Sequence, residues 1–130
     1  MIFDKDFLEK LLSEAQASPR LRQHYDLRNS TQDGSQRMLN ALMPETEVPI
    51  HRHESTAETV VCLTGRLEVI LLEKLPDEMG LETYRVLSQQ LLCPAEGRYG
   101  MQIPAGAWHT VEAIEPSVIF EAKDGAYHPE

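Results

Sequence analysis

Two histidines and a glutamate stand close together in the middle of the chain, and their spacing suits metal binding. His51 and His53 are two residues apart, and Glu58 follows five residues after the second histidine. Residues two apart on a β-strand point to the same face, so this spacing predicts a strand over residues 48–53 that directs two imidazoles at one point. Glu58 opens the next expected strand and can bring a carboxylate oxygen to that point. Two imidazoles and one carboxylate suit a divalent transition metal and leave coordination positions open for a ligand.

A third imidazole completes this set. His109 follows Pro104 and Gly106 in the order Pro-x-Gly-x-x-His. Proline pre-sets its φ and glycine accepts a positive φ, so the pattern predicts a tight turn that delivers His109 at the start of a strand. Three neutral imidazoles and one carboxylate fit one divalent transition metal, with Fe, Mn, Ni, Zn and Cu all compatible. Taken singly, the same residues also suit a surface histidine pair and a solvated acid.

The composition excludes several classes of partner. The chain has 130 residues, enough for about one domain, and a formal net charge of −9, which argues against nucleic-acid binding. Its longest uncharged apolar run, Val69–Leu72, is too short to cross a membrane. Two cysteines do not make a disulfide framework, and the first residues do not resemble a secretory signal. We therefore expect a cytoplasmic protein with no nucleic-acid or membrane partner.

One segment of this acidic chain has a net positive charge. Between Ser18 and Arg37 the basic residues are Arg20, Arg22, Arg28 and Arg37, and the acidic ones are Asp26 and Asp33. Two interpretations stay open: a solvated connector, or a site for a small anion, because the arginine fork matches phosphate and carboxylate.

The periodicity predicts one helix followed by short strands. Apolar residues at helical spacing over residues 4–17 predict an amphipathic helix that ends at Ser18-Pro19. Strands are expected at 37–42, 48–53, 58–63, 66–73, 84–87, 89–92, 101–103, 110–114 and 117–123. Such spacing with Gly and Pro between strands is typical of a β-sandwich or barrel. We expect an N-terminal helix and arm over residues 1–36 packed on a barrel over 37–130, in one structural domain.

The paired motifs resemble those of the cupin superfamily. His51-x-His53, four residues, Glu58, six residues and Gly65 resemble the first cupin motif, and Pro104-x-Gly106-x-x-His109 resembles the second. The leading glycine of the first motif is Glu45 here, and the late asparagine of the second is Ala113. The resemblance implies an all-β cupin double-stranded β-helix, or jelly-roll barrel, with His51, His53, Glu58 and His109 as metal ligands.

A narrower resemblance covers most of the chain. The stretches 17–25, 36–42 and Phe120-Glu121-x-Lys123-x-Gly125-x-Tyr127-His128-Pro129 are similar to WbuC-type cupin metalloproteins. Members tend to be encoded near polysaccharide or O-antigen biosynthesis genes, and their reaction is not established. The resemblance implies a cupin fold and a metal site, and it does not supply a substrate.

Further candidates lie on strands that would border the barrel. Arg37 and Asn40 have opposite parity, so only one of them should face inward unless a bulge intervenes. With Arg20 and Arg22 they are the candidate substrate-binding residues. Glu121 and Lys123 share parity, and two interpretations stay open: catalytic groups with perturbed pKa values facing the pocket, or an outward surface pair.

These residues allow three functions. The first is a metal-dependent enzyme, such as an isomerase or epimerase, acting on a sugar or sugar-phosphate-like molecule in polysaccharide biosynthesis, with Glu121 or Lys123 moving a proton. The second is an Fe(II)-dependent dioxygenase, and the third is a non-catalytic cupin that binds a small molecule. We also expect a homodimer, because the apolar stripe of the helix needs a surface to cover it.

Overall fold

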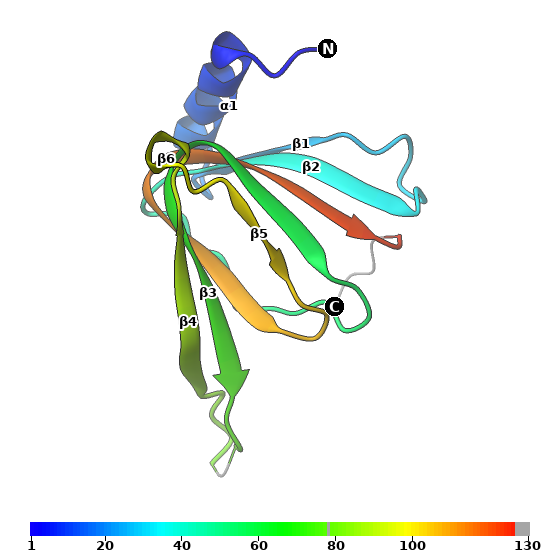
Figure 1. Cartoon of the computed structure of the whole chain (residues 1–130), viewed down its shortest axis with the longest axis vertical. Coiled ribbons are helices and arrows are strands. Elements are labelled where there is room, and N and C mark those ends of the chain that lie inside the picture. The colour runs from blue at the N-terminus through cyan, green and yellow to red at the C-terminus, as the bar shows by residue number, and fades with distance from the viewer. Residues whose placement is uncertain (78, 127–130) are drawn as a thin grey trace.

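The computed structural model describes residues 1–77 and 79–126, and within them the chain forms a mostly antiparallel β-structure with one α-helix (Figure 1). The elements are α1 (Lys5–Ala17), β1 (Arg22–Asp26), β2 (Ser35–Leu42), β3 (Glu58–Lys74), β4 (Tyr84–Leu92), a 3-10 turn η1 (Pro94–Glu96), β5 (Gly100–Ile103) and β6 (Trp108–Asp124). The C-terminal motif residues Tyr127, His128 and Pro129 lie outside the described residues.

Two long strands hold the fold together. The strand order is β1-β2-β6-β3-β4, with β5 paired to β3, and every pairing is antiparallel. The start of β3 and the end of β6 lie in one layer with β1, β2 and β5, whereas the end of β3 and the start of β6 lie in the other layer with β4 (Figure 1). This arrangement confirms the predicted all-β jelly roll with an N-terminal helix.

Both long strands bend where they pass from one layer to the other. The register of β3 against β6 shifts between Cys62 and Leu67, around Gly65, which has a φ of 104°. A Cβ at Gly65 would lie 2.5 Å from the carbonyl oxygen of Pro116 and 2.7 Å from the Cα of Ser117. Only glycine allows this approach, so the predicted breaks at 64–65 and 116 are corners within continuous strands, not turns between separate ones.

The N-terminal half of the chain differs from the prediction in two places. The strand expected over residues 48–53 is wrong: the segment is irregular, and only His51 forms an isolated bridge, with His109. Conversely, β1 forms within the arm that the sequence assigned to no regular element. It pairs along its whole length with β2, from Arg22 opposite Leu42 to Asp26 opposite Met38.

Alternation along β2 and β6 separates two apolar cores. One core lies between the layers and consists of Leu42, Val60, Cys62, Leu67, Val69, Leu92, Ile103, Val111, Ala113 and Ile119. The other lies under α1 and consists of Leu11, Ala15, Leu39, Ala41, Met43 and Val118. Since neighbours across β2 and β6 share a face, Asn40 lies on the barrel side with its partner Ile119, and Leu39 lies on the helix side with its partner Phe120.

Helix α1 confirms the predicted amphipathic helix. The Asp4 carboxylate accepts a hydrogen bond from the backbone N–H of Phe7 at 2.9 Å and caps the first turn. Its apolar stripe is buried on the chain's own sheet, with Leu11 and Ala15 at most 2% exposed. The stripe therefore does not require a second copy, and the homodimer stays a prediction. No helix in the described part of the chain is long and apolar enough to cross a membrane.

Candidate metal centre

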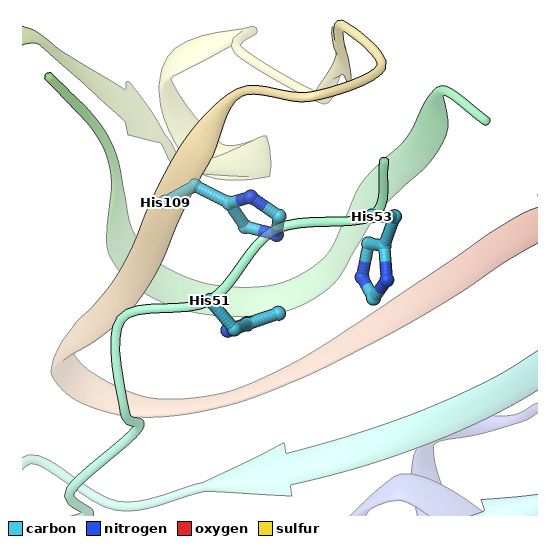
Figure 2. A group of neighbouring side chains, drawn as sticks. All are labelled: His51, His53 and His109. Atoms are coloured by element: carbon cyan, nitrogen blue, oxygen red, sulfur yellow. The ribbon is translucent and has the colours of Figure 1, made fainter. Parts of the chain in front are cut away.

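Three histidines from two segments converge on one point. His51 and His53 come from the irregular segment between β2 and β3, and His109 is the second residue of β6 (Figure 2). One ligand nitrogen from each ring lies within 4.8 Å of the others. The ring centroids of His51 and His109 are 4.2 Å apart, and that of His53 lies 5.2 Å and 5.6 Å from them.

Backbone hydrogen bonds hold the two segments together. The N–H of His51 donates to the carbonyl of His109 at 3.0 Å, and the N–H of His109 donates to the carbonyl of His51 at 2.8 Å. The N–H of Gly106 donates to the carbonyl of His53 at 2.8 Å, and Gly106 has a φ of 80° in the predicted tight turn. The Pro-x-Gly-x-x-His pattern thus positions the third imidazole and also secures the loop that carries the first two.

Two of the rings are oriented by carbonyl groups. Nδ1 of His51 lies 2.9 Å from the carbonyl oxygen of Pro49, and Nδ1 of His109 lies 2.9 Å from that of Ala107. A carbonyl accepts only, so each Nδ1 carries the proton and each Nε2 is left with a lone pair. This is the carbonyl partnership that orients metal-ligating histidines in proteins.

Glu58 lies beside the three histidines. It is 5% exposed at the first position of β3, and its Oε2 lies 3.2 Å from Nε2 of His109 and 3.9 Å from Nε2 of His53. Two donors each about 2.1 Å from one ion stand roughly 3.0–3.4 Å apart, which the distance to His109 satisfies and the distance to His53 exceeds. Nε2 of His109 is fully buried and, within the described residues, makes no hydrogen bond of standard geometry, although the Glu58 carboxylate lies next to it. The three imidazoles form the group whose ligand atoms are mutually close, and their chemistry and spacing fit a divalent transition metal with Glu58 as a candidate fourth ligand.

The protonation states also suit metal binding. Burial lowers the pKa of His51, and burial together with the Lys123 ammonium lowers the pKa of His53 to about 4. Burial raises the pKa of Glu58, but His109 and Lys123 outweigh it and the net shift is downward. Burial likewise lowers the pKa of His109, yet the Glu58 carboxylate and the Ala107 carbonyl raise it overall. Near neutral pH, His51 and His53 are therefore neutral and Glu58 is ionised, as ligands must be, whereas the raised pKa of His109 favours a proton that a bound ion would have to displace.

The structure places Glu121 and Lys123 on the barrel side of β6. Their β3 partners are Val60 and Glu58, and both side chains line the cavity beside the histidines. Lys123 Nζ lies 3.1 Å from Nε2 of His53. Burial, followed by repulsion from Glu58, raises the pKa of Glu121 to about 7. The two residues are not an outward surface pair.

Replacing Glu121 with Gln should change how the stability of the metal-free protein depends on pH. The folded protein holds the Glu121 proton up to about pH 7, whereas the unfolded chain releases it near its ordinary pKa of 4.5, so the wild type loses stability as the pH rises between these values. Glu121→Gln should therefore be more stable than the wild type by about 1–3 kcal/mol at pH 8, with the difference shrinking towards pH 5. Urea unfolding in EDTA measures it.

The exposed Glu112 on the same strand provides the control for this test. Glu112→Gln should show little pH-dependent difference from the wild type. A stability difference for Glu121→Gln that stays constant between pH 5 and pH 8 would contradict the assignment of the shifted proton to Glu121.

The four candidate substrate-binding residues separate into two pairs. Arg22 and Asn40 line the cavity beside the histidines. Arg37 is on the opposite face of β2, where its guanidinium pairs with Asp33 at 2.8 Å, and Arg20 lines neither cavity next to the site. The structure thus brings one residue of the arginine segment to the site and leaves Arg20 and Arg37 away from it.

Two adjoining cavities surround the histidines. The inner one, about 80 Å³, is lined by the three histidines, Glu58, Glu121 and an apolar wall formed by Val60, Ile103 and Val111. The outer one, about 510 Å³, lies within the usual size of small-molecule sites. Sequence reasoning missed its lining residues Gln36 and 54–56. Gln36 could have been found from its parity with Asn40 on β2, whereas residues 54–56 belong to a loop with no periodic signal.

Comparison with solved structures places the fold among cupins. TT1209 from Thermus thermophilus matches with a TM-score of 0.63 and 22% identity, over 95% of this chain and 96% of that one. An oxalate oxidase in complex with the substrate analogue glycolate matches with a TM-score of 0.58 and 17% identity, over 86% and 55%. The capsular polysaccharide assembling protein CapF from Staphylococcus aureus matches with a TM-score of 0.58 and 17% identity, over 86% and 30%. At these identities the likeness shows the jelly-roll fold.

The sequence itself was compared with curated proteins and with family models. No curated protein matches it. The model of a domain of unknown function, DUF6016, matches residues 3–80, which span α1, β1, β2, both loop histidines, Glu58 and the whole of β3. Because this match covers more than half of the sequence, the chain belongs to the DUF6016 family, and its structure shows that the family's residues are part of a cupin jelly roll.

Proposed function

We propose that this protein is a metal-dependent enzyme that acts on a small sugar or sugar-phosphate-like molecule, as an isomerase or epimerase in polysaccharide biosynthesis. The observation that carries the proposal is the inner cavity, where a possible metal-ligand set and two candidate proton-transfer groups line the same small space. The similarity of the sequence to WbuC-type cupins supports the polysaccharide context, as does the fold shared with a capsular polysaccharide assembling protein.

The ligand set defines what a bound ion would contribute. His51, His53, Glu58 and His109 would hold one divalent transition metal, which would polarise a carbonyl or hydroxyl oxygen of the ligand. Carbonyl groups contact Nδ1 of His51 and of His109, so the orientation of both rings, and with it the direction of each Nε2, is fixed without an ion. The chain therefore offers donors that need little rearrangement.

Glu121 is the group best placed to move a proton. Its pKa of about 7 lies near neutral pH, where a carboxyl group can both accept and return a proton. In an isomerase or epimerase, Glu121 would take the proton from a carbon next to a carbonyl group. The C–H electron pair would form a C=C bond while the carbonyl π pair moves onto its oxygen. In an isomerase, Glu121 would give the proton to the former carbonyl carbon, and the hydroxyl proton of the first carbon would pass to the oxygen of the former carbonyl group. In an epimerase, a solvent proton would add to the opposite face of the same carbon, and Glu121 would release its proton to solvent. Val60, Ile103 and Val111 would keep water from this position.

Lys123 provides positive charge beside the same carbon. Its ammonium group lies 3.1 Å from Nε2 of His53 and interacts electrostatically with the carboxylates of Glu58 and Glu121. In the proposed reaction it would donate a hydrogen bond to the oxygen that becomes negative. We therefore propose Glu121 as the general base and acid, and Lys123 as the stabilising cation.

Solvent-isotope exchange tests this proposal. Protein loaded separately with each of the five candidate metals is incubated in D₂O with a panel of sugar nucleotides and sugar phosphates, and NMR follows both mass-neutral conversion and deuterium uptake at carbon. We expect uptake with at least one substrate, and a decrease of about 100-fold or more in Glu121→Gln. Glu112→Gln, an exposed acid on β6, should retain the rate. A panel that is neither converted nor labelled would contradict the proposal.

A second candidate is an Fe(II)-dependent dioxygenase, which the same imidazole and carboxylate ligands suit. Its support is the ligand set itself together with the fold shared with an oxalate oxidase. The two candidates differ in their co-substrate, because an isomerase consumes no oxygen. Oxygen uptake by iron-loaded protein that depends on an added organic substrate would favour the dioxygenase. Ligand binding without conversion or oxygen uptake would instead favour a non-catalytic binding protein.

A further inference from the structure

We infer that the ligand of this site is a hydroxylated acid, whose anionic group binds the guanidinium of Arg22 while a hydroxyl group of the ligand donates a hydrogen bond to Oδ1 of Asn40 in the inner cavity. The inference deepens the proposed function, on which it rests for the reaction, by stating the substrate class. It assigns separate roles to two residues that line one continuous space.

The guanidinium group of Arg22 borders both cavities and has no hydrogen-bond or ion-pair partner among the described residues. Arg22 is the first residue of β1, is half-buried, and lies opposite Leu42, a core residue on the barrel side of β2. Its side chain lines the inner and the outer cavity. Within residues 1–77 and 79–126, its guanidinium has no hydrogen bond or ion pair. A half-buried guanidinium has five N–H donors to satisfy, and a two-oxygen anion in the cavity would satisfy two of them in parallel.

The other arginines of this segment are not available to the site. Arg20 lines neither cavity. Arg28 pairs with Asp26 through contacts of 2.8–3.1 Å, and Arg37 pairs with Asp33 at 2.8 Å. Their positive charges are already matched by carboxylates of the same segment. Arg22 is therefore the arginine of this segment whose fork is directed at the site and available to a ligand.

Asn40 is the residue proposed to bind the hydroxylated end of the ligand. Its side chain is 3% exposed, lines the inner cavity, and has an Oδ1 with no hydrogen-bond partner in the described part of the chain. An unpaired buried amide oxygen costs about 1–3 kcal/mol, which a donor from the ligand would recover. A hydroxyl group provides that donor. The inner cavity, about 80 Å³, has room for a hydroxylated end of a molecule but not for a whole sugar ring with its substituents.

The charges around the cavity favour an anion over a neutral sugar. In the inner cavity Arg22 and Lys123 face the carboxylates of Glu58 and Glu121, and the outer cavity adds Asp124 and Glu54, of which Glu54 pairs with Arg52. With these acids ionised, a divalent metal on the proposed ligands would leave one positive charge in excess, and an uncompensated charge in a partly buried site is costly. A carboxylate or phosphate on the ligand restores the balance. The outer cavity, about 510 Å³, accommodates the part of the molecule that carries it.

Binding measurements with three related probes test the inference. Calorimetry compares D-glucose 6-phosphate, D-gluconate and neutral D-glucose on the metal-free protein and on the metal-loaded protein. We expect at least one of the two anions to bind and D-glucose not to bind detectably. Binding of the phosphate probe alone identifies a sugar phosphate, and binding of gluconate alone identifies a sugar acid.

Variants then assign the contacts. Arg22→Gln should weaken binding of the anion by about 10- to 100-fold, and Arg22→Lys by less, because lysine keeps the charge but not the fork. Arg85→Gln, at an exposed site on β4, is the matched control and should not change the affinity. Asn40→Ala should weaken binding of the sugar anion without changing the affinity for inorganic phosphate. Circular dichroism checks that each variant is folded.

The outcomes separate this inference from the proposed function. Anion binding to metal-free protein that depends on Arg22 supports the inference even if no substrate is turned over. Anion binding that appears only with metal and is unchanged in Arg22→Gln overturns it, while leaving the metal site intact. Equal affinities for glucose and both anions, or no binding of any probe, also overturn it.

Discussion

His109→Ala is expected to abolish stoichiometric metal binding and to weaken metal affinity by more than about 100-fold. Loss of a group that merely orients a ligand already costs 10- to 100-fold, so the loss of a ligand should cost more. His109 is 2% exposed, its Nδ1 is held by the carbonyl of Ala107 at 2.9 Å, and its Nε2 lies among the other candidate ligands. Elemental analysis and competition with a chromophoric chelator measure metal content and affinity.

The control for this experiment is His24→Ala, which removes an exposed histidine on β1 that lines neither cavity. It should bind metal as the wild type does. His51→Ala should behave as His109→Ala does, and Glu58→Gln should retain weaker binding because three imidazoles remain. Equal metal content in the wild type, His51→Ala and His109→Ala would show that the ion, if present, is held elsewhere.

Gly65→Ala is expected to destabilise the protein by about 2–5 kcal/mol, lowering Tm by about 10 °C or more. Two costs combine at this position. Alanine is strained at a φ of 104°, and its Cβ would meet the backbone of Pro116 and Ser117 at 2.5–2.7 Å, where nothing flexible can yield. Thermal and urea unfolding of metal-free protein measure the loss.

Gly97→Ala separates these two costs. Gly97 also has a positive φ, 76°, but a Cβ there would meet no atom within 4 Å. Its substitution should cost only about 1 kcal/mol, the penalty for the backbone conformation. If Gly65→Ala were no more destabilising than Gly97→Ala, the close approach of the two strands at the corner would not be a determinant of stability.

The sequence predicts those parts of the site and fold in which several residues close together in the chain determine the local conformation. Pro104, Gly106 and His109 form a turn whose conformation is determined by residue type, and the structure confirms that turn. The same holds for α1, whose apolar stripe and Asp4 cap are local signals. His51 and His53 converge as expected, but not through a strand: their direction comes from hydrogen bonds to residues more than 50 positions away.

Long-range pairing explains what the sequence did not reveal. β1 has little apolar alternation of its own, and it exists because β2 offers it an edge, so the inward direction of Arg22 follows from a register that no local pattern encodes. Likewise, whether Gly65 marks a turn or a corner depends on the approach of Ser117 from β6. The sequence shows that Glu121 and Lys123 lie on the same face of their strand. It does not show which face of that strand points into the barrel, because this depends on α1 covering the opposite face of the sheet.

The two layers of this barrel share their two longest strands, β3 and β6, which should make unfolding of the two layers cooperative. The β3–β6 ladder runs from Glu58 opposite Lys123 to Leu72 opposite Trp108, so neither layer can detach without breaking hydrogen bonds in the other. Sub-global opening is therefore suppressed, and amides near Glu58, His109 and Glu121 should exchange with solvent only when the whole domain unfolds. The candidate centre thus joins two strands that should open only when the domain unfolds to an irregular segment, and the reciprocal hydrogen bonds of His51 and His109 connect that segment to the same cooperative unit.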